Sequence, residues 1–193
     1  MKPYFVGVAG ATCSGKSTLC KKVASMCPEV THIKMDDFFR DKDSLPVQGN
    51  YFNREVLESL EIDYLTKVLD RLKKGKEARM PIYSKKEERR TGYREVHAGE
   101  IVLAEGFLLF SAPRIRDMLD LRVFIDIDGE TLRKRRLKRQ PDIGSYLDEV
   151  VIPAYNQYKE EAMRKAHRII DGGLSQEQVL GEFLNLMNLR IPV

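Results

Sequence analysis

The feature that most constrains this chain is the segment Gly10-Ala-Thr-Cys-Ser-Gly15-Lys16-Ser17, which matches G-x-x-x-x-G-K-[ST] at every fixed position. It follows a short apolar run at residues 4–9 and precedes a helical pattern that begins at Lys16. In this context the loop wraps a phosphate with backbone N–H groups, and the helix presents its positive end to the anion. The pattern therefore predicts a nucleoside triphosphate site.

Within this site, Lys16 is expected to reach the β- and γ-phosphates, and the Ser17 hydroxyl is expected to bind Mg²⁺. The cofactors implied are ATP and Mg²⁺. The residues expected to hold the nucleotide are those of the loop and the first helical turn, namely Gly10, Ala11, Thr12, Cys13, Ser14, Gly15, Lys16, Ser17 and Thr18.

Strand-like and helical patterns alternate along the remainder of the chain. Apolar runs typical of strands occupy residues 30–35, 101–104, 121–126 and 168–171. Helical spacing covers residues 54–72, 131–139, 146–165 and 175–189. This alternation predicts an α/β fold of the P-loop NTPase type, with three layers (α/β/α) around a mainly parallel sheet.

We expect a single P-loop domain over residues 1–193, with two local departures from the layered fold. One is a hairpin insertion at about 79–97, whose two strand-like pieces flank a polar connection containing Thr91-Gly92. The other is a short lid at about 133–145, where a very basic helical stretch precedes Pro141.

Composition and charge exclude several other classes. The chain has 33 basic and 29 acidic residues, a net charge of +4, which is too mild for a dedicated nucleic-acid binder. No apolar run approaches the roughly 20 residues of a membrane span, and the N-terminus lacks a signal-peptide pattern. Cys13, Cys20 and Cys27 lack metal-ligand spacing and are interpreted as free thiols, typical of a reducing cytoplasm. We expect a small-molecule substrate, and the oligomeric state stays open.

The motifs found elsewhere in the chain decide which class of P-loop protein the sequence resembles. A Ras-type GTPase would carry an N-K-x-D box, which the sequence lacks, and a motor ATPase would normally be larger or repeat itself. A small-molecule kinase needs a carboxylate beside the acceptor hydroxyl, at the end of a strand near the loop. Asp36-Asp37 follows the second predicted strand and meets this need.

Four segments together resemble the superfamily of uridine kinases and nicotinamide riboside kinases, and the resemblance covers roughly residues 3–185. The segments are residues 10–18, residues 36–40, residues 105–110, and the spaced set Pro141-Asp142, Tyr146, Pro153, Tyr155 and Tyr158. The resemblance implies transfer of the ATP γ-phosphoryl group to the 5′-hydroxyl of a ribonucleoside.

On that resemblance Asp36 is the general base, with Asp37 as the alternative. Phe39 of the same motif is placed in the substrate site. Glu105, which follows a buried strand, resembles the family glutamate on the metal side of the phosphates.

Six of the seven residues from Arg133 to Arg139 are basic. A solvated helix face or a nucleic-acid patch would also account for such a run. The resemblance favours a lid helix, in which Arg135 and Arg139 act on the transferred phosphoryl group and Arg136 contacts the nucleotide. The lid is shorter than is usual in uridine kinases, so some of its phosphate contacts are expected to be missing or supplied by Lys138.

The sugar and base contacts of the family are only partly present. Glu55 stands where an aspartate usually binds the ribose 2′- and 3′-hydroxyls, and Arg54 stands where nicotinamide riboside kinases place a stacking aromatic. A cationic nicotinamide ring would be repelled by Arg54.

Tyr83 of Pro81-Ile82-Tyr83 resembles the uridine kinase residue that meets the base, and Arg90 falls at a family arginine. Lys85 and Glu88 replace the aromatic and the histidine that follow the tyrosine in that family.

These patterns predict a uridine kinase-like enzyme that uses Mg-ATP. Nicotinamide riboside kinase is the first alternative. Another small-metabolite kinase of the same superfamily, as pantothenate kinase and phosphoribulokinase illustrate, is the second. A catalytically weak nucleotide-binding regulator is the last, and it would be favoured by a defective loop or a missing acid at position 36, neither of which is seen.

Overall fold

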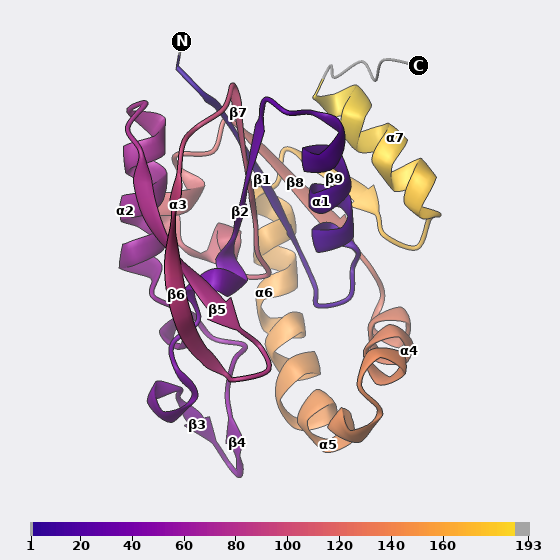
Figure 1. The fold of residues 1–193 in the computed structure, drawn as a ribbon. Coiled ribbons are helices and arrows are strands. Elements are labelled where there is room, and N and C mark those ends of the chain that lie inside the picture. The colour runs from indigo at the N-terminus through magenta and orange to yellow at the C-terminus, as the bar shows by residue number, and fades with distance from the viewer. Residues whose placement is uncertain (1, 188–193) are drawn as a thin grey trace.

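The computed structural model describes residues 2–187, and its centre is a sheet of five parallel strands in the order β2-β7-β1-β8-β9 (Figure 1). The strands are β1 (Tyr4–Gly10), β2 (Val30–Lys34), β7 (Ile101–Glu105), β8 (Leu121–Asp126) and β9 (Arg168–Asp171). The register brings Gly7 opposite Ala104 on one side and Arg122 on the other. The expected α/β fold with a mainly parallel sheet is therefore confirmed.

Helices cover both faces of the sheet, which is why its strands read as continuous apolar runs. On one face lie α1 (Lys16–Met26) and α7 (Gln176–Leu186); on the other lie α2 (Ile62–Lys73), α3 (Pro113–Arg116) and α6 (Ile152–Lys165). Alternate side chains of β1 serve the two cores, since Phe5 packs in one and Val6 in the other. Cys20 and Cys27 are buried free thiols in the second core.

The chain between β2 and β7 leaves the sheet and builds a separate wall at its carboxyl edge. It contains the small ribbon β3 (Val47–Gln48) and β4 (Tyr51–Phe52), then α2, then the hairpin β5 (Ala78–Ser84) and β6 (Arg89–Val96). The hairpin was expected, but the prediction of its turn was wrong.

Thr91-Gly92 lies inside β6, and the turn is formed by residues 85–88. A register irregularity between Ile82 and Tyr83 and a positive φ of 53° at Glu88 let the chain reverse there without a glycine.

The helix expected over residues 54–72 is also shorter than its apolar spacing indicated. Residues before Ile62 form an extended connection with one 3₁₀ turn, Leu57–Ser59. Side chains compete for the backbone there: Asn53 Oδ1 accepts from the Glu55 N–H at 2.7 Å, and Ser59 Oγ donates to Val56 O at 2.5 Å. Pairing of Phe39 with Leu60 then holds the segment beside the chain that follows β2.

After β8 the chain forms α4 (Gly129–Arg139), a 3₁₀ turn at Pro141–Ile143, α5 (Gly144–Tyr146) and a π-helical segment, Leu147–Val151, which leads into α6. Pro153 is the second residue of α6, and because the π-helical segment leads directly into α6, its missing N–H lies within a continuous helical stretch.

The shorter 3₁₀ segments are Met35–Phe38, Lys42–Ser44 and Leu109–Ser111. Helix α7 begins with the expected capping box of Ser175 and Gln178; its expected end at Leu189 lies outside the described residues. No helix in residues 2–187 is long and apolar enough to cross a membrane.

Candidate active site

The loop between β1 and α1 is shaped to approach a phosphate closely. Gly10 has a φ of 151°, and a Cβ there would lie 2.5 Å from the carbonyl oxygen of Ile125 on the neighbouring strand β8. Gly15 precedes α1 with a φ of 98°, and no side chain caps the helix N-terminus. The free N–H groups of the first turn therefore face the loop, as an anion site requires.

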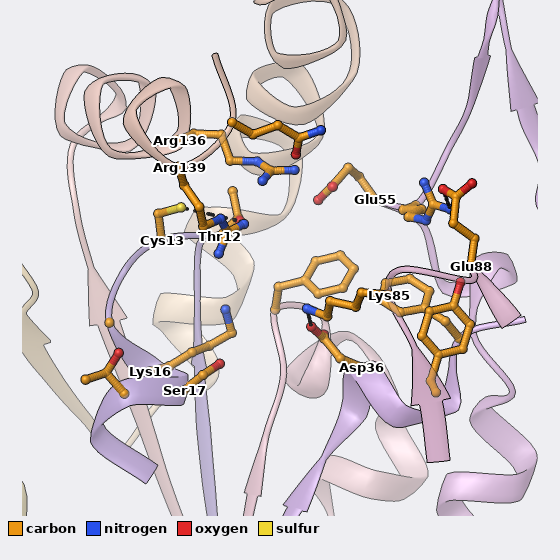
Figure 2. Close-up of a pocket in the computed structure, with 17 residues that line it drawn as sticks. Thr12, Cys13, Lys16, Ser17, Asp36, Glu55, Lys85, Glu88, Arg136 and Arg139 are labelled. Carbon is orange, nitrogen blue, oxygen red and sulfur yellow. Dashed lines mark hydrogen bonds and ion pairs between the residues drawn. The ribbon is translucent and has the colours of Figure 1, made fainter. Parts of the chain in front are cut away.

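Lys16 lies at the mouth of this loop. Its side chain is largely buried, and its Nζ donates a hydrogen bond to Ala11 O at 3.1 Å. The ammonium group is thus held over the concave side of the loop, on the same cavity as Asp36 (Figure 2).

Beside Lys16, Ser17 and Glu105 form a pair of oxygen ligands. Ser17 Oγ donates to Glu105 Oε2 at 2.7 Å, and Glu105 ends strand β7 with 4% of its surface exposed. His32 Nε2 lies 3.4 Å from the other carboxylate oxygen. Burial raises the pKa of Glu105, but the contact with His32 and the charge of Lys16 outweigh it, so that the pKa falls below its ordinary value.

A hydroxyl and an ionised carboxylate are the donors that Mg²⁺ takes when phosphates and water complete its shell, so these two residues fit that ion. Within residues 2–187 no cluster of three or more His, Cys, Asp or Glu side chains could hold a metal without such help.

Asp36 lies at the carboxyl end of β2, in the 3₁₀ turn Met35–Phe38. Its Oδ2 accepts a hydrogen bond from Lys85 Nζ at 2.6 Å. Burial raises the pKa of Asp36, yet the nearby charges of Lys85 and Lys16 overcome this and hold the pKa below its usual range. Asp37 does not line the cavity, and its pKa is raised by burial. Of the pair, Asp36 is the carboxylate that lines the cavity beside the loop.

Asp36 opens onto a cavity of about 480 Å³ that runs from the loop to the hairpin. One side is aromatic: the rings of Phe39 and Phe107 are stacked with centroids 6.3 Å apart, and Tyr83 lies 5.8 Å from Phe39. The Tyr83 hydroxyl is buried and has no hydrogen-bond partner among the described residues. A flat ring could lie against this aromatic wall.

Glu55 enters the same cavity from the segment after β4. Burial raises its pKa to about 7, although the charge of Arg136 on α4 opposes the shift. Next to it, the Arg54 N–H donates to the Tyr146 hydroxyl at 3.1 Å, which ties the segment to the end of the lid. Glu55 forms no ion pair within residues 2–187. Its carboxyl oxygens are therefore available to accept hydrogen bonds from hydroxyl groups of a ligand.

The basic helix α4 lies over the loop. Two of its arginines contact the loop, and a third points into the cavity. Arg139 Nη2 donates to Thr12 Oγ1 at 3.2 Å, and Arg135 Nη1 donates to Cys13 O at 3.4 Å. Arg136 points into the cavity near Glu55, and its buried Nε has no partner within the described part of the chain. Positive charge is therefore concentrated beside the loop, where the γ-phosphate end of a bound triphosphate is expected.

A second cavity, about 570 Å³, adjoins the outer side of the loop. It lies between α4 and α7, and Arg135 and Arg139 border it together with Gly172 and Leu174, which follow β9. Cys13 and Gly15 line both cavities, so the loop stands between them. One cavity can hold the nucleoside part of a donor while the other holds an acceptor.

The sequence as a whole matches one family model over residues 5–177, described as the phosphoribulokinase/uridine kinase family. The chain belongs to this family. Among curated relatives, the uridine kinases of Alkaliphilus metalliredigens and Clostridium perfringens are each 30% identical to it. These alignments cover 91% and 89% of this chain and 90% and 88% of the respective relatives.

Plant members of the family are longer. The chloroplastic uridine/cytidine kinase of Arabidopsis thaliana is 28% identical over 89% of this chain, but the match covers only 38% of the plant protein. The chain thus spans about two fifths of the length of these relatives.

Two solved structures show the same fold. One is described as a possible uridine kinase from Bacillus stearothermophilus, with a TM-score of 0.67, 19% identity, and coverage of 89% of this chain and 90% of that one. The other is the phosphoribulokinase of Rhodobacter spheroides, with a TM-score of 0.66, 13% identity, and coverage of 90% and 73%.

One residue assigned to the acceptor by family resemblance lies elsewhere. Arg90 does not line the cavity; it contacts Glu61 and donates to the Tyr93 hydroxyl at 2.9 Å, where it joins the hairpin to the start of α2. The remaining predicted site residues lie on the loop or on one of the two cavities, except Glu105, which joins the site through Ser17. Lys138, considered as a source of lid contacts to phosphate, is exposed and lines neither cavity.

Five residues that line this cavity were not among the predicted site residues: Arg54, Lys85, Glu88, Phe107 and Gln140. Phe107 could have been found, because it follows Glu105 in a motif already singled out. The sequence departs from the pattern of the families it resembles at Arg54, Lys85 and Glu88. This departure was the only sign in the sequence that these residues belong to the site.

Proposed function

We propose that this protein is an ATP-dependent nucleoside kinase that transfers the γ-phosphoryl group to the 5′-hydroxyl of a ribonucleoside. The observation that carries the proposal is the position of Asp36: an ionised carboxylate faces Lys16 across one cavity, while the loop that holds Lys16 borders a second cavity. This arrangement supports two substrates that meet at the loop. The similarity to uridine kinases over most of the chain supports the choice of a nucleoside.

The donor is held by the loop and α4. Backbone N–H groups of the loop and the Lys16 ammonium bind the β- and γ-phosphates, and the nucleoside part of ATP occupies the second cavity. Ser17 and Glu105 would hold Mg²⁺, which neutralises phosphate charge when bound. Arg139 and Arg136 face the end of the triphosphate and stabilise the charge that spreads over the transferred group. Arg135 acts from the side of the second cavity.

Asp36 orients the acceptor. The acceptor oxygen forms a bond to the γ-phosphorus, the bond from that phosphorus to the β,γ-bridging oxygen breaks, and ADP leaves. The hydroxyl proton passes to the Asp36 carboxylate. Because phosphoryl transfer has a loose transition state, alignment by Asp36 contributes more to the rate than its strength as a base.

The walls of the cavity fit a ribonucleoside. Glu55 accepts hydrogen bonds from the vicinal 2′- and 3′-hydroxyls, and the base lies against Phe39, Phe107 and Tyr83. A 2′-deoxynucleoside would leave one of these bonds unmade at a cost of about 1–3 kcal/mol. Ribonucleosides are therefore preferred by roughly one to two orders of magnitude in kcat/KM.

The test is an ADP-release assay on purified protein with ATP and a panel of ribonucleosides, 2′-deoxyribonucleosides, nicotinamide riboside and acyclic alcohols. Lys16→Ala should abolish turnover, and Asp36→Asn should lower kcat by about 10²–10⁴ while ATP still binds. Asp37→Asn is the matched control and should retain activity.

Near-normal turnover of Lys16→Ala would remove the kinase proposal. Activity on an acyclic alcohol without activity on any nucleoside would assign the protein to the branch of the family that acts on other metabolites.

A further inference from the structure

Lys85 reaches the acceptor cavity from a part of the chain that is remote from the loop. It lies in the four-residue turn of the β5–β6 hairpin, 49 residues from Asp36, and its Nζ is 2.6 Å from Asp36 Oδ2 (Figure 2). The Lys85 side chain is 72% exposed, whereas that of Asp36 is 32% exposed. The contact therefore joins a solvent-exposed side chain to the carboxylate at which the acceptor is expected to react.

The turn that carries Lys85 is itself fixed to the molecule. The Lys42 N–H donates to Glu88 O at 3.0 Å, and the Glu88 carboxylate contacts Lys42 and lies 2.7 Å from Arg54 Nη2. On the far side of the turn, the Arg90 N–H donates to Asp41 Oδ1 at 2.8 Å. These contacts fix the backbone of the hairpin turn relative to Asp36, so that the Lys85 side chain stays within reach of the Asp36 carboxylate.

We propose that Lys85 is a positioning residue for phosphoryl transfer: it binds one oxygen of Asp36 and so turns the other oxygen toward the acceptor hydroxyl. The inference rests on the proposed role of Asp36. The Asp36 carboxylate can rotate about its Cβ–Cγ bond, and a hydrogen bond from Lys85 Nζ to Oδ2 favours one orientation. No side-chain hydrogen bond or ion pair in residues 2–187 engages the other oxygen, Oδ1, which is left to accept the proton.

Charged groups from several elements face Asp36, and Lys85 is the one in direct contact. Lys16 of α1 and Arg139 of α4 are the other cations that lower its pKa, while burial raises it. Three acids are also near: Asp37 in the same turn, Glu55 after β4, and Glu105 at the end of β7. Removal of the Lys85 charge should therefore raise the pKa of Asp36, since burial and the acids remain.

The first arm of the test is kinetic, with uridine and ATP both saturating. We expect Lys85→Met to lower kcat about tenfold and Lys85→Arg to restore most of it, because the positive charge returns. Lys86→Met removes the neighbouring exposed lysine, which lies outside the cavity, and should leave kcat unchanged. In an Asp36→Asn background, Lys85→Met should cost nothing further, as expected of two residues that act as a unit.

The second arm does not depend on activity. In protein labelled with ¹³C at the aspartate carboxyl, the Asp36 signal is identified by its absence in Asp36→Asn, and its titration is followed. Lys85→Met should move this pKa upward, and Lys86→Met should not.

An unchanged kcat in Lys85→Met, or the same Asp36 titration in both lysine variants, would overturn the proposal. An equal loss in the Asp36→Asn background would overturn it too, because Lys85 would then act on a substrate directly. A fully active Asp36→Asn protein would instead remove the proposed role of Asp36, so the two failures are distinguishable.

Discussion

Glu55 exists in two protonation states near neutral pH, and only one of them suits its proposed task. Burial raises its pKa to about 7, with Arg136 opposing and Asp36 reinforcing the shift. The ionised carboxylate can accept hydrogen bonds from both hydroxyls of a vicinal diol, whereas the protonated group must donate one. The affinity for a ribonucleoside should therefore follow the titration of this single side chain.

We predict that kcat/KM for uridine rises with pH through about 7, since this parameter reports the free enzyme. The Glu55→Gln variant should lose that rise and show a lower plateau. Glu58→Gln, which changes an exposed glutamate three residues away, is the control. A Glu55→Gln enzyme that kept the wild-type pH profile would exclude Glu55 as the titrating group.

The same side chain should also make folding stability depend on pH. Because the folded-state pKa lies above the ordinary value of 4.5, the protonated form favours the folded state, and this stability is lost as pH rises through about 7. Glu55→Gln should thus have the Tm of the wild type at about pH 4 and exceed it by about 5–10 °C at about pH 8, since roughly 3 kcal/mol is lost over this range. Scanning calorimetry at the two pH values measures the difference, and equal Tm values at both would contradict it.

At the scale of elements, the position of Asp36 depends on how closely β7 approaches the turn after β2. A Cβ at Gly106, just beyond β7, would lie 2.5 Å from the Cβ of Met35, the buried residue before Asp36. Neither atom can move without its backbone. The absence of a side chain at position 106 therefore allows the chain just after Glu105 to approach the turn that carries Asp36, the two carboxylates proposed to serve the metal and the acceptor.

Gly106→Ala should accordingly displace the turn, destabilise the fold by about 1–3 kcal/mol and lower kcat about tenfold or more. Gly181→Ala is the matched control: Gly181 is exposed in α7, and a Cβ there would meet nothing within 4 Å, so alanine should stabilise the protein by about 0.5–1 kcal/mol. Denaturant unfolding and steady-state kinetics on both variants provide the measurements. A Gly106→Ala protein with wild-type stability and kcat would show that the turn adapts freely.

The elements that the sequence predicted well are those defined by local patterns. The loop, Asp36 and the sheet strands 121–126 and 168–171 follow from residues close together in the chain. The hairpin turn was misplaced because tertiary contacts of Glu88 with Lys42 and Arg54 decide it. The start of α2 was misplaced because Ser59 donates to nearby backbone carbonyls, a local competition that hydrophobic spacing does not reveal. The contact of Lys85 with Asp36 spans 49 residues and has no local signature.

At the scale of the whole molecule, the two cavities share the loop and α4 but differ in the rest of their lining. The second cavity, proposed for the donor, is completed by α7 and the segment after β9, whereas the first cavity, proposed for the acceptor, is completed mainly by the excursion between β2 and β7. The excursion adds no strand to the central sheet: its helix α2 packs on one face, while its small ribbon and its hairpin border the proposed acceptor cavity.

This arrangement predicts that the acceptor preference can be changed without loss of ATP binding or phosphoryl transfer. Replacing residues 41–99 by the corresponding segment of the Clostridium perfringens relative should transfer that protein's acceptor preference, while KM for ATP stays within about threefold, a change of less than about 1 kcal/mol. A chimera that folds but loses ATP affinity would show that donor and acceptor are not separable. If they are, a family that shares one phosphate site can acquire new acceptors by altering a single continuous insert.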